Sequence, residues 1–309
     1  MTIEILQTGK LLASCEAALK ERFKIHYLAE ADDKAAFLSR IASKVRAIAG
    51  GNVDAALIKA LPKLEIIANF GVGYDSIDTK AAKAANVRVT NTPDVLNDAM
   101  AEITVGLMIS LARRLPQADR FVRDGRWPSG SFPLQSELNG KTLGILGLGR
   151  IGKEIAVRAQ AMKMRVVYHG RKEQANQPYV YYPKLVDMAR DCDWLVLIAP
   201  GGKSTDKIVS REVMEALGPK GMLVNVGRGT LVDQAAMVEM LASGALGGAA
   251  LDVFEDEPRV PQELFGLENV VLSPHQGSAT NQTRDAMGAL VVANLDAHFA
   301  GEPLISAVV

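Results

Sequence analysis

The sequence of 309 residues predicts an α/β protein built on parallel sheets, and three observations lead to this class. Short apolar runs of strand length alternate along the chain with segments that have a helical pattern. One run, Leu143–Leu146, leads directly into Gly147-x-Gly149-x-x-Gly152 and then into a helical pattern. Hydrophobic residues make up 48% of the chain, and this length and composition allow two domains with sizeable cores.

The composition argues against several classes of partner. The formal net charge is +0, so we expect no bulk attraction to nucleic acid or to an anionic membrane. No apolar run approaches the roughly 18 residues that a membrane span needs. Cys15 and Cys192 lie far apart, and the first residues show no signal pattern. We therefore expect a soluble cytoplasmic protein with reduced cysteines, no metal, and no nucleic-acid or membrane partner.

The first part of the chain is expected to form one α/β unit. Its expected elements are strands at Ile3–Leu6, Ala47–Ala49, Leu64–Ala68 and Val87–Thr90 and a helix at Ala13–Arg22. The strand that ends at Ala68 breaks into the Gly-x-Gly of GVGYD. Such a break can offer backbone N–H groups to an anion, although a plain tight turn fits the local sequence equally well.

A long apolar helix is expected at Asp98–Leu115, followed by an irregular segment rich in glycine and proline at Asp124–Leu138. This segment carries Trp127 and Phe132. These aromatic side chains either pack locally or contribute to substrate binding or dimerisation.

The glycine motif predicts a dinucleotide site, because each glycine has a physical role there. Gly147 permits a tight turn, Gly149 lets backbone N–H groups approach a pyrophosphate, and Gly152 lets the helix pack close to the strand. The helix that follows directs its N-terminal donors and the positive end of its dipole at the phosphates.

The turn after the next strand, Arg165–Tyr168, points to the type of dinucleotide. Enzymes that use NAD place an acidic residue about 20 residues beyond the glycines, where it binds the ribose 2′-hydroxyl. This chain has Arg171 and Lys172 there instead. A guanidinium suits a 2′-phosphate, so we predict NADP(H), with NAD(H) as the alternative cofactor. The other interpretation of Arg171 and Lys172 is a basic turn that is solvated and binds no ligand.

Three polar residues follow later strands directly and are the candidates for the chemistry. The expected elements here are strands at Trp194–Ile198, Met222–Val226, Gly248–Val253 and Val270–Leu272 and a closing helix at Ala286–Phe299. Arg228, Glu257 and His275 come after three of these strands, and the carboxyl ends of parallel strands meet at one edge of the sheet.

These residue types suit one reaction in particular. An imidazole exchanges protons near neutral pH, a carboxylate beside it fixes its orientation, and an arginine presents two donors to a substrate carboxylate. Beside a nicotinamide, Arg228, Glu257 and His275 therefore favour hydride transfer between the cofactor and a 2-oxo or 2-hydroxy acid.

The chain resembles a D-isomer-specific 2-hydroxyacid dehydrogenase over nearly its whole length. The matching pieces are NFGVGYDSID, GILGLGRIG, NVGRGTLVD, LDVFEDEP and SPHQGSAT, in the order of the family. The resemblance implies two Rossmann-like domains, with the cofactor domain inserted into a flavodoxin-like substrate domain, and a homodimer built around the cofactor domains. It places the substrate-binding domain at residues 1–97 and 286–309 and the NAD(P)-binding domain at 98–285.

The resemblance also implies individual roles. His275 would be the acid/base with Glu257 as its partner, and Arg228 would bind the substrate carboxylate and polarise the 2-oxo group. The backbone of Val72 and Gly73 would hold the other carboxylate oxygen. The implied cofactor contacts are Gly147, Leu148, Gly149, Arg150, Ile151 and Gly152 at the pyrophosphate, Arg171 and Lys172 at the 2′-phosphate, and Pro200, Thr205, Val226, Gly227, Arg228, Asp252, His275 and Gly277 along the groove from adenine to nicotinamide.

Within the family, the HGRK turn and the short length resemble the glyoxylate/hydroxypyruvate and hydroxyphenylpyruvate reductase branch. This implies NADPH-dependent reduction of a small 2-oxo acid to a D-2-hydroxy acid, with an aryl pyruvate as the alternative substrate. Gly201-Gly202 and Gly227 depart from the usual Leu-Thr and alanine, and both lie by the cofactor.

Two rival functions are weighed against this one. A cofactor-sensing protein that binds a partner without turnover could keep all three catalytic residues. A formate dehydrogenase-like enzyme is disfavoured because that branch is longer and lacks the pairing of Glu257 with His275.

Overall fold

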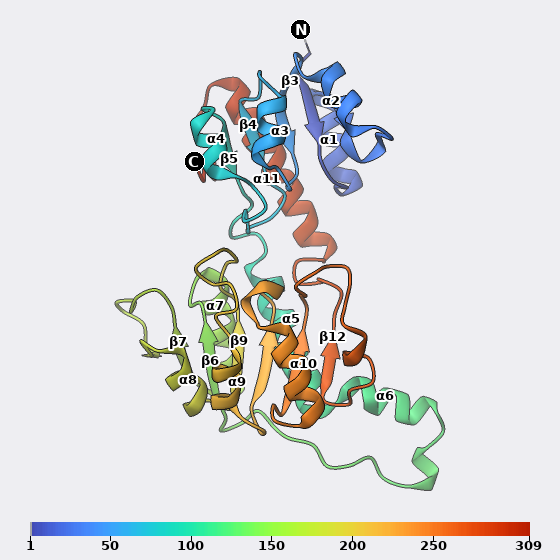
Figure 1. Cartoon of the computed structure of the whole chain (residues 1–309), viewed down its shortest axis with the longest axis vertical. Helices are drawn as coiled ribbons and strands as arrows, with labels where there is room; N and C mark the ends of the chain where they lie inside the picture. Colours follow the sequence, from blue (N-terminus) through green and yellow to red (C-terminus); the bar gives the residue numbers. More distant parts are fainter. Residues whose placement is uncertain (1) are drawn as a thin grey trace. The chain divides into compact units, whose positions relative to one another are not determined.

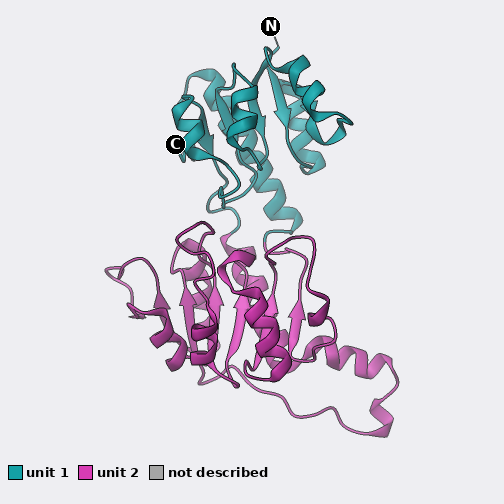
Figure 2. Cartoon of the chain, viewed as in Figure 1, with its two compact units in different colours: residues 1–96, 278–309 teal, residues 97–277 magenta. Residues whose placement is uncertain are grey.

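The computed structural model describes residues 2–309. This part of the chain divides into two compact units (Figure 1), coloured separately in Figure 2. Unit 1 contains the chain up to Leu96 together with Ser278–Val309, and unit 2 is the continuous stretch Asn97–Gly277. Unit 2 is therefore inserted into unit 1 in the sequence.

Unit 1 contains a five-stranded sheet with the strand order β2-β1-β3-β4-β5. All neighbouring strands in it are parallel. The strands are β1 (Glu4–Gln7), β2 (Lys24–Tyr27), β3 (Val45–Ala49), β4 (Ile66–Ala68) and β5 (Arg88–Thr90). This is the order of flavodoxin-like doubly wound sheets, as the sequence predicts.

Helices cover both faces of this sheet. They are α1 (Ala13–Arg22), α2 (Lys34–Ile41), α3 (Ala55–Ala60), α4 (Thr79–Ala84) and α11 (Asn281–Ala300), with the short turn η1 (Leu28–Glu30). In β4, Ile67 belongs to a buried cluster with Leu57 of α3. Its neighbour Ile66 belongs to a second cluster with Leu19 of α1 and Leu295 of α11. Successive side chains of a strand point to opposite faces, which is why one strand serves both clusters.

Unit 2 contains a seven-stranded sheet with the strand order β12-β11-β10-β9-β6-β7-β8, again parallel throughout. The strands are β6 (Thr142–Leu146), β7 (Arg165–His169), β8 (Val180–Tyr181), β9 (Trp194–Leu197), β10 (Met222–Asn225), β11 (Gly248–Leu251) and β12 (Val270–Leu272). The six strands from β6 to β11 follow the Rossmann order, and β12 extends the sheet by one strand beyond β11. The order reverses between β6 and β9, and doubly wound sheets bind ligands at the carboxyl ends of the strands at such a point.

Two helical layers enclose this sheet as well. The helices are α5 (Asn97–Arg113), α6 (Leu115–Arg123), α7 (Arg150–Ala161), α8 (Leu185–Asp191), α9 (Arg211–Leu217) and α10 (Gln234–Ser243), with the short turns η2 (Trp127–Ser129), η3 (Gly229–Leu231) and η4 (Gln262–Leu264). Met108 of α5 and Ile155 of α7 belong to one buried cluster. Met188 of α8, Met214 of α9 and Met240 of α10 belong to the other.

The central strands of unit 2 are apolar throughout because both faces of the sheet are covered. All four residues of β9 and all four of β11 are buried. Continuous apolar runs of this length are typical of parallel sheets enclosed by helices, which explains why these strands could be predicted. None of the described helices is long and apolar enough to span a lipid bilayer.

The structure differs from the sequence prediction at two helices. The predicted helix at residues 98–115 is interrupted at Arg114, which has φ 48° and caps the start of α6, and Pro116 occupies the first turn of α6. Proline has no N–H and clashes with the preceding helical turn, so α5 cannot continue through it. The closing helix begins at Asn281 because the side chain of Thr280 caps its N-terminus.

The junction between the units at Gly277 and Ser278 also comes earlier than the predicted domain boundary at 285/286. Helix α11 packs against α1 and β4 of unit 1, so the whole helix, including its first turn, belongs to unit 1. Which unit binds the substrate and which binds the cofactor stays a prediction at this point.

Candidate active site

The glycine turn after β6 lies against the carboxyl end of β9, at the point where the strand order reverses. Gly147 has φ +102°, and a Cβ atom on it would lie 3.0 Å from the backbone N of Ala199. A Cβ atom on Gly152 would lie 2.3 Å from the carbonyl oxygen of Gly147. Both positions therefore require glycine, one for its backbone conformation and one for the close start of α7.

The N-terminus of α7 is open above Gly149. This glycine is the N-cap and supplies no side-chain cap. Apart from the adjoining chain, no described heavy atom lies within 4 Å of the place where its Cβ would be. The side chain of Leu148 is buried, which leaves only its backbone to face a ligand. The N-terminal N–H groups of a helix and the helix dipole favour an anion, so this turn fits a pyrophosphate.

The basic turn after β7 is tied to the glycine turn by Gln174. Arg171 and Lys172 are both exposed. The side-chain nitrogen of Gln174 donates to the carbonyl of Leu148 at 2.6 Å, and its backbone N–H donates to the hydroxyl of Tyr168 at 2.8 Å. The sequence interpretation missed Gln174, because a glutamine in a loop has no local pattern that indicates such a contact.

The turn after β10 carries Arg228 and is held by Asn225, a second residue that the sequence interpretation missed. Asn225 is buried; its side-chain oxygen accepts from the N–H of Gly227 at 3.1 Å, and its nitrogen donates to the carbonyl of Arg228 at 2.9 Å. One guanidinium nitrogen of Arg228 donates to the carbonyl of Gly227 at 2.8 Å. A Cβ atom on Gly227 would lie 3.0 Å from the carbonyl oxygen of Ala199, so glycine here lets the turn lie close to β9.

The loop after β11 packs directly on the residue that follows Arg228. A Cβ atom on Gly229 would lie 1.9 Å from the backbone carbon of Phe254, a distance that no side chain can accommodate. In the same loop, one carboxylate oxygen of Glu257 accepts from the N–H of Phe254 at 3.1 Å. The other lies 2.7 Å from Nδ1 of His275.

His275 is held in place by the loop around Asp252. Its backbone has φ +54°, and its N–H donates to the carbonyl of Asp252 at 2.9 Å. The carboxylate of Asp252 is fully buried and accepts from the hydroxyl of Ser273 at 2.6 Å and from the N–H groups of Gln276 and Gly277 at 2.7 and 2.8 Å. These bonds stabilise a left-handed backbone conformation that residues other than glycine rarely adopt. Asp252, assigned to the cofactor groove by resemblance, therefore also orders the turn that carries His275.

Unit 2 thus brings three predicted residues to one edge of its sheet. β10, β11 and β12 are adjacent parallel strands, and Arg228, Glu257 and His275 follow them in that order. The side chain of His275 is 50% exposed and that of Glu257 35%, so the imidazole is accessible while its Nδ1 is engaged. The remaining imidazole nitrogen, Nε2, is the atom that can meet a substrate.

Other predicted residues lie at the end of β9 or in unit 1. The hydroxyl of Thr205 donates to the carbonyl of Pro200 at 2.8 Å and closes the loop after β9, and Val226 is buried. Val72 and Gly73 belong to the turn after β4 in unit 1.

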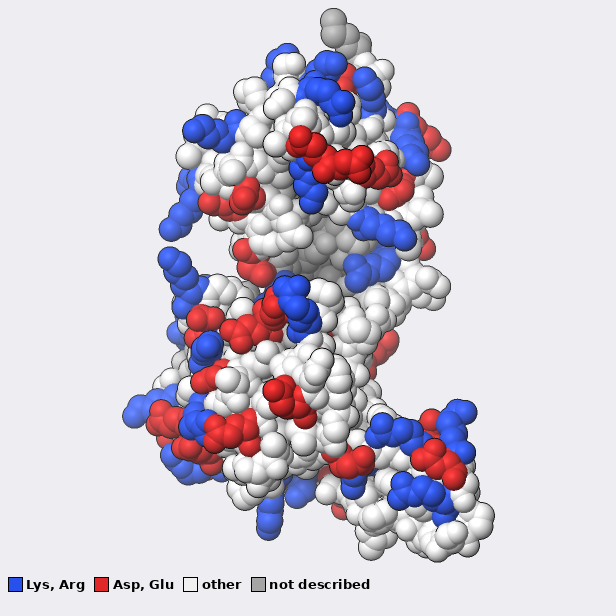
Figure 3. All heavy atoms as spheres, turned by 45° about the vertical axis from the view of Figure 1, so that its right-hand side comes forward, with Lys and Arg blue, Asp and Glu red and all other residues white. Residues whose placement is uncertain are grey.

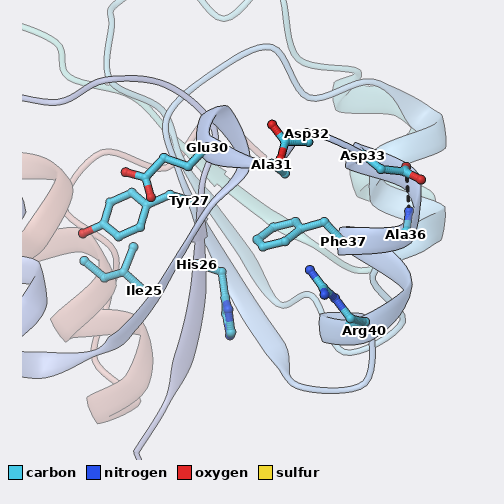
Figure 4. A pocket seen from close by; sticks show the side chains of 10 residues that line it. All are labelled: Ile25, His26, Tyr27, Glu30, Ala31, Asp32, Asp33, Ala36, Phe37 and Arg40. Carbon is cyan, nitrogen blue, oxygen red and sulfur yellow. Dashed lines mark hydrogen bonds between the residues drawn. The ribbon is translucent and has the colours of Figure 1, made fainter.

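A cavity of about 490 Å³ in unit 1 lies at β2, η1 and α2 (Figure 4). Its lining includes His26, Tyr27 and Arg40, and the dashed line in Figure 4 is the capping bond from the N–H of Ala36 to Asp33. None of the predicted site residues lines this cavity, so we assign it no part in the chemistry.

Acidic and basic side chains are interspersed over the face shown in Figure 3, in agreement with a formal net charge of +0. This face therefore shows no large field of one sign.

A Rossmann-ordered sheet, a glycine turn at its switch point and a histidine–carboxylate pair with a nearby arginine define an NAD(P)-dependent dehydrogenase. The chain belongs to the D-isomer-specific 2-hydroxyacid dehydrogenases: the model of the "D-isomer specific 2-hydroxyacid dehydrogenase, NAD binding domain" family matches residues 105–277. The family is one of oxidoreductases.

Individual relatives share almost the full length of the chain. A glyoxylate/hydroxypyruvate reductase of Arabidopsis thaliana is 47% identical and aligns over 100% of this chain and 99% of that protein. A hydroxyphenylpyruvate reductase of Plectranthus scutellarioides is 46% identical over 99% of each. The crystal structure of an NADPH-dependent glyoxylate/hydroxypyruvate reductase from Sinorhizobium meliloti, in complex with NADP and malonate, superimposes with a TM-score of 0.95 at 44% identity, covering 100% of this chain and 97% of that one. The fold class and the branch of the family expected from the sequence are confirmed.

Proposed function

We propose that this protein is an NADPH-dependent reductase of small 2-oxo acids, with glyoxylate and hydroxypyruvate as substrates and D-2-hydroxy acids as products. The observation that carries the proposal is the 2.7 Å contact between His275 and Glu257. Glu257 follows β11, which lies between β10, the strand that leads to Arg228, and β12, the strand that leads to His275. The relatives named glyoxylate/hydroxypyruvate reductase support the choice of substrate.

The geometry gives each catalytic residue a separate task. Glu257 occupies Nδ1 of His275, so Nε2 is the nitrogen that delivers a proton to the oxygen of the 2-oxo group. The guanidinium of Arg228 binds the substrate carboxylate and polarises the 2-oxo group. When bound, the reduced nicotinamide supplies a hydride to the 2-oxo carbon. In the reverse direction His275 takes the proton back, and Glu257 stabilises the imidazolium that forms.

The binding residues are divided between the two units. We assign cofactor binding to unit 2, where the backbone of the glycine turn holds the pyrophosphate and Arg171 and Lys172 hold the 2′-phosphate. We assign the second contact with the substrate carboxylate to the N–H groups of Val72 and Gly73 in unit 1.

An aryl pyruvate is the second candidate substrate. The observation in its favour is the 46% identity with a relative named hydroxyphenylpyruvate reductase, nearly as high as that with the glyoxylate/hydroxypyruvate reductase. The chemistry at the 2-oxo group would be the same, because only the side chain of the substrate differs.

We also propose a homodimer in the cytoplasm. Helix α6 and the segment after it extend away from the sheet of unit 2 (Figure 1), and Val122, Trp127 and Leu134 in this arm are 53%, 65% and 101% exposed. Apolar side chains on such an arm suit a second copy of the chain. Two buried free cysteines are typical of a reducing compartment.

Initial rates of NADPH and NADH oxidation with glyoxylate, hydroxypyruvate, phenylpyruvate and 4-hydroxyphenylpyruvate test the proposal. We expect NADPH and one of the small substrates to give the highest kcat/KM. His275→Ala is expected to lose turnover by at least about 100-fold while NADPH still binds, measured by nucleotide fluorescence. His26→Ala, a change of the same type in unit 1, serves as the control. A fully active His275→Ala would refute the assigned chemistry, and a wild-type protein inactive with every acid would favour a cofactor-sensing role.

A further inference from the structure

The turn after β4 in unit 1 is enclosed by two asparagines that come from neighbouring strands. β4 and β5 are parallel, and Ala68 pairs with Thr90 at their carboxyl ends. The next residues, Asn69 and Asn91, therefore leave the sheet side by side. The backbone N–H of Asn69 extends the ladder by donating to the carbonyl of Thr90 at 3.0 Å. Asn69 is only 3% exposed.

The two side-chain amides bind three consecutive carbonyls of the turn. The nitrogen of Asn69 donates to the carbonyl of Gly71 at 3.0 Å and to that of Gly73 at 2.9 Å. The nitrogen of Asn91 donates to the carbonyl of Val72 at 2.9 Å. Every carbonyl from residue 71 to residue 73 thus accepts from an asparagine side chain, and that of Gly71 also accepts from the backbone N–H of Thr92 at 3.0 Å.

This arrangement determines where the N–H groups of the turn point. In a trans peptide the C=O of one residue and the N–H of the next point in opposite directions. Because the carbonyls of Gly71 and Val72 face the asparagines, the N–H groups of Val72 and Gly73 face away from them. Within the described chain, neither N–H donates a hydrogen bond to another residue. Neighbouring backbone N–H groups that are not used within the protein can bind an anion.

We propose that Asn69 and Asn91 are positioning residues that orient the N–H groups of Val72 and Gly73 toward the carboxylate of the substrate. This inference rests on the proposed function, and it deepens it by assigning two side chains that need not touch the substrate. Asparagine is required because both side chains act as donors. An aspartate has the same size, but its ionised carboxylate cannot donate and would repel both the carbonyls and an incoming anion.

Asn69→Asp is therefore the decisive variant, with Asn91→Asp as the second. For Asn69→Asp we expect KM for the 2-oxo acid to rise on the order of ten- to a hundredfold, because two hydrogen bonds that orient the turn are lost. KM for NADPH should stay within about twofold, since the glycine turn of unit 2 is unchanged. The matched control is Asn86→Asp, at an exposed position of unit 1 with φ 56°, which should leave both KM values unchanged.

Two further measurements separate this role from a general loss of stability. Asn69→Ala loses the same two hydrogen bonds as Asn69→Asp but adds no negative charge. Its KM for the 2-oxo acid should therefore lie between those of the wild type and Asn69→Asp. The Kd of oxalate for the NADP-loaded protein, measured by calorimetry, should rise in parallel with KM. A rise in both KM values, or a lowered Tm with an unchanged oxalate Kd, would assign the asparagines to stability alone and overturn the inference.

The proposed function and this inference can fail separately. If the wild type reduces a 2-oxo acid and Asn69→Asp has the same KM as the wild type, the inference is wrong and the proposed function stands. If the wild type reduces no 2-oxo acid, the proposed function falls, and oxalate binding still decides the inference. Unchanged or absent oxalate binding then overturns it, whereas weaker binding to Asn69→Asp supports it.

Discussion

Gly229→Ala is expected to disable the active site although residue 229 has no chemical role. A Cβ atom there would lie 1.9 Å from the backbone carbon of Phe254, 2.1 Å from its carbonyl oxygen and 2.3 Å from the nitrogen of Glu255. Ordinary contacts of a Cβ atom begin at 3.4 Å, so one of the two backbone segments must move by about 1.5 Å. Both segments are buried: Phe254 follows the buried strand β11, and Gly229 is the first residue of η3.

The size of the effect follows from this displacement. Inserting a methyl group into a closely packed site costs about 1–3 kcal/mol, and a clash with backbone belongs at the upper end of that range. For a unit of this size, that corresponds to a decrease in Tm on the order of 5–10 °C. The displaced loop carries Glu257, which contacts His275, and a misplacement of about 1 Å in a catalytic group lowers the rate by about 100-fold. We therefore expect kcat/KM to fall by about 100-fold.

Steady-state kinetics and thermal unfolding of Gly229→Ala, compared with Gly266→Ala, measure both effects. The control glycine also belongs to unit 2, and no described heavy atom lies within 4 Å of its added Cβ beyond the adjoining residues. The activity and Tm of Gly266→Ala should therefore match the wild type. Wild-type kcat/KM and Tm in Gly229→Ala would show that the loop after β11 is not fixed by its packing on residue 229.

Three further outcomes follow from contacts outside the catalytic residues. Gln174→Leu should raise KM for NADPH severalfold more than KM for NADH, because the bond from Gln174 to the glycine turn holds the basic turn that we assign to the 2′-phosphate. Burial raises the pKa of the Cys15 thiol to about 11 and that of Cys192 to about 12, so iodoacetamide at pH 8 should label neither thiol in the native protein and both after unfolding. The hydrogen bond from Arg46, with a weaker one from His298, lowers the pKa of the Glu65 carboxyl. The ionised Glu65 carboxylate should therefore stabilise unit 1 at every pH above the ordinary pKa of a carboxyl group, and this stabilisation should be lost as the pH falls through the lowered pKa.

Each of these has a clear contrary result. An equal increase of both KM values in Gln174→Leu would separate this residue from the choice of cofactor. Rapid labelling of either cysteine in the native protein would show that its surroundings open readily. For Glu65→Gln, urea midpoints at pH 7 and near pH 3 should show a larger loss of stability at the higher pH. An equal loss at both would assign the residue to packing rather than to charge.

The sequence was most informative where strands are buried on both sides. The apolar runs that became β9 and β11 were evident because helices cover both faces of the sheet. Two of the four edge strands, β2 and β8, were missed for the opposite reason. β2 (Lys24–Tyr27) contains one exposed and three half-buried residues, and β8 (Val180–Tyr181) is only two residues long, so neither forms an apolar run.

The candidate site divides in the same way. Arg228, Glu257 and His275 were found because they directly follow strands of a parallel sheet, and position along the chain is enough to place them at one edge. Gln174, Asn225 and Asn69 were missed because their side chains act on backbone groups of turns, which only the folded structure reveals. Asn69 did offer a signal, since it directly precedes a Gly-x-Gly turn and its amide can reach back to the backbone there.

The insertion of unit 2 into unit 1 has a consequence for how the chain folds as it is synthesised. The first 96 residues provide the five strands of unit 1, but one face of that sheet is covered by α11, from Asn281 to Ala300. Until this helix leaves the ribosome, Ile66 and its neighbours on that face lack part of their apolar cover. Unit 2, whose residues are continuous, can be completed earlier. The part of the protein that is made first is thus the last to be finished, and it is the part that a chaperone would need to protect.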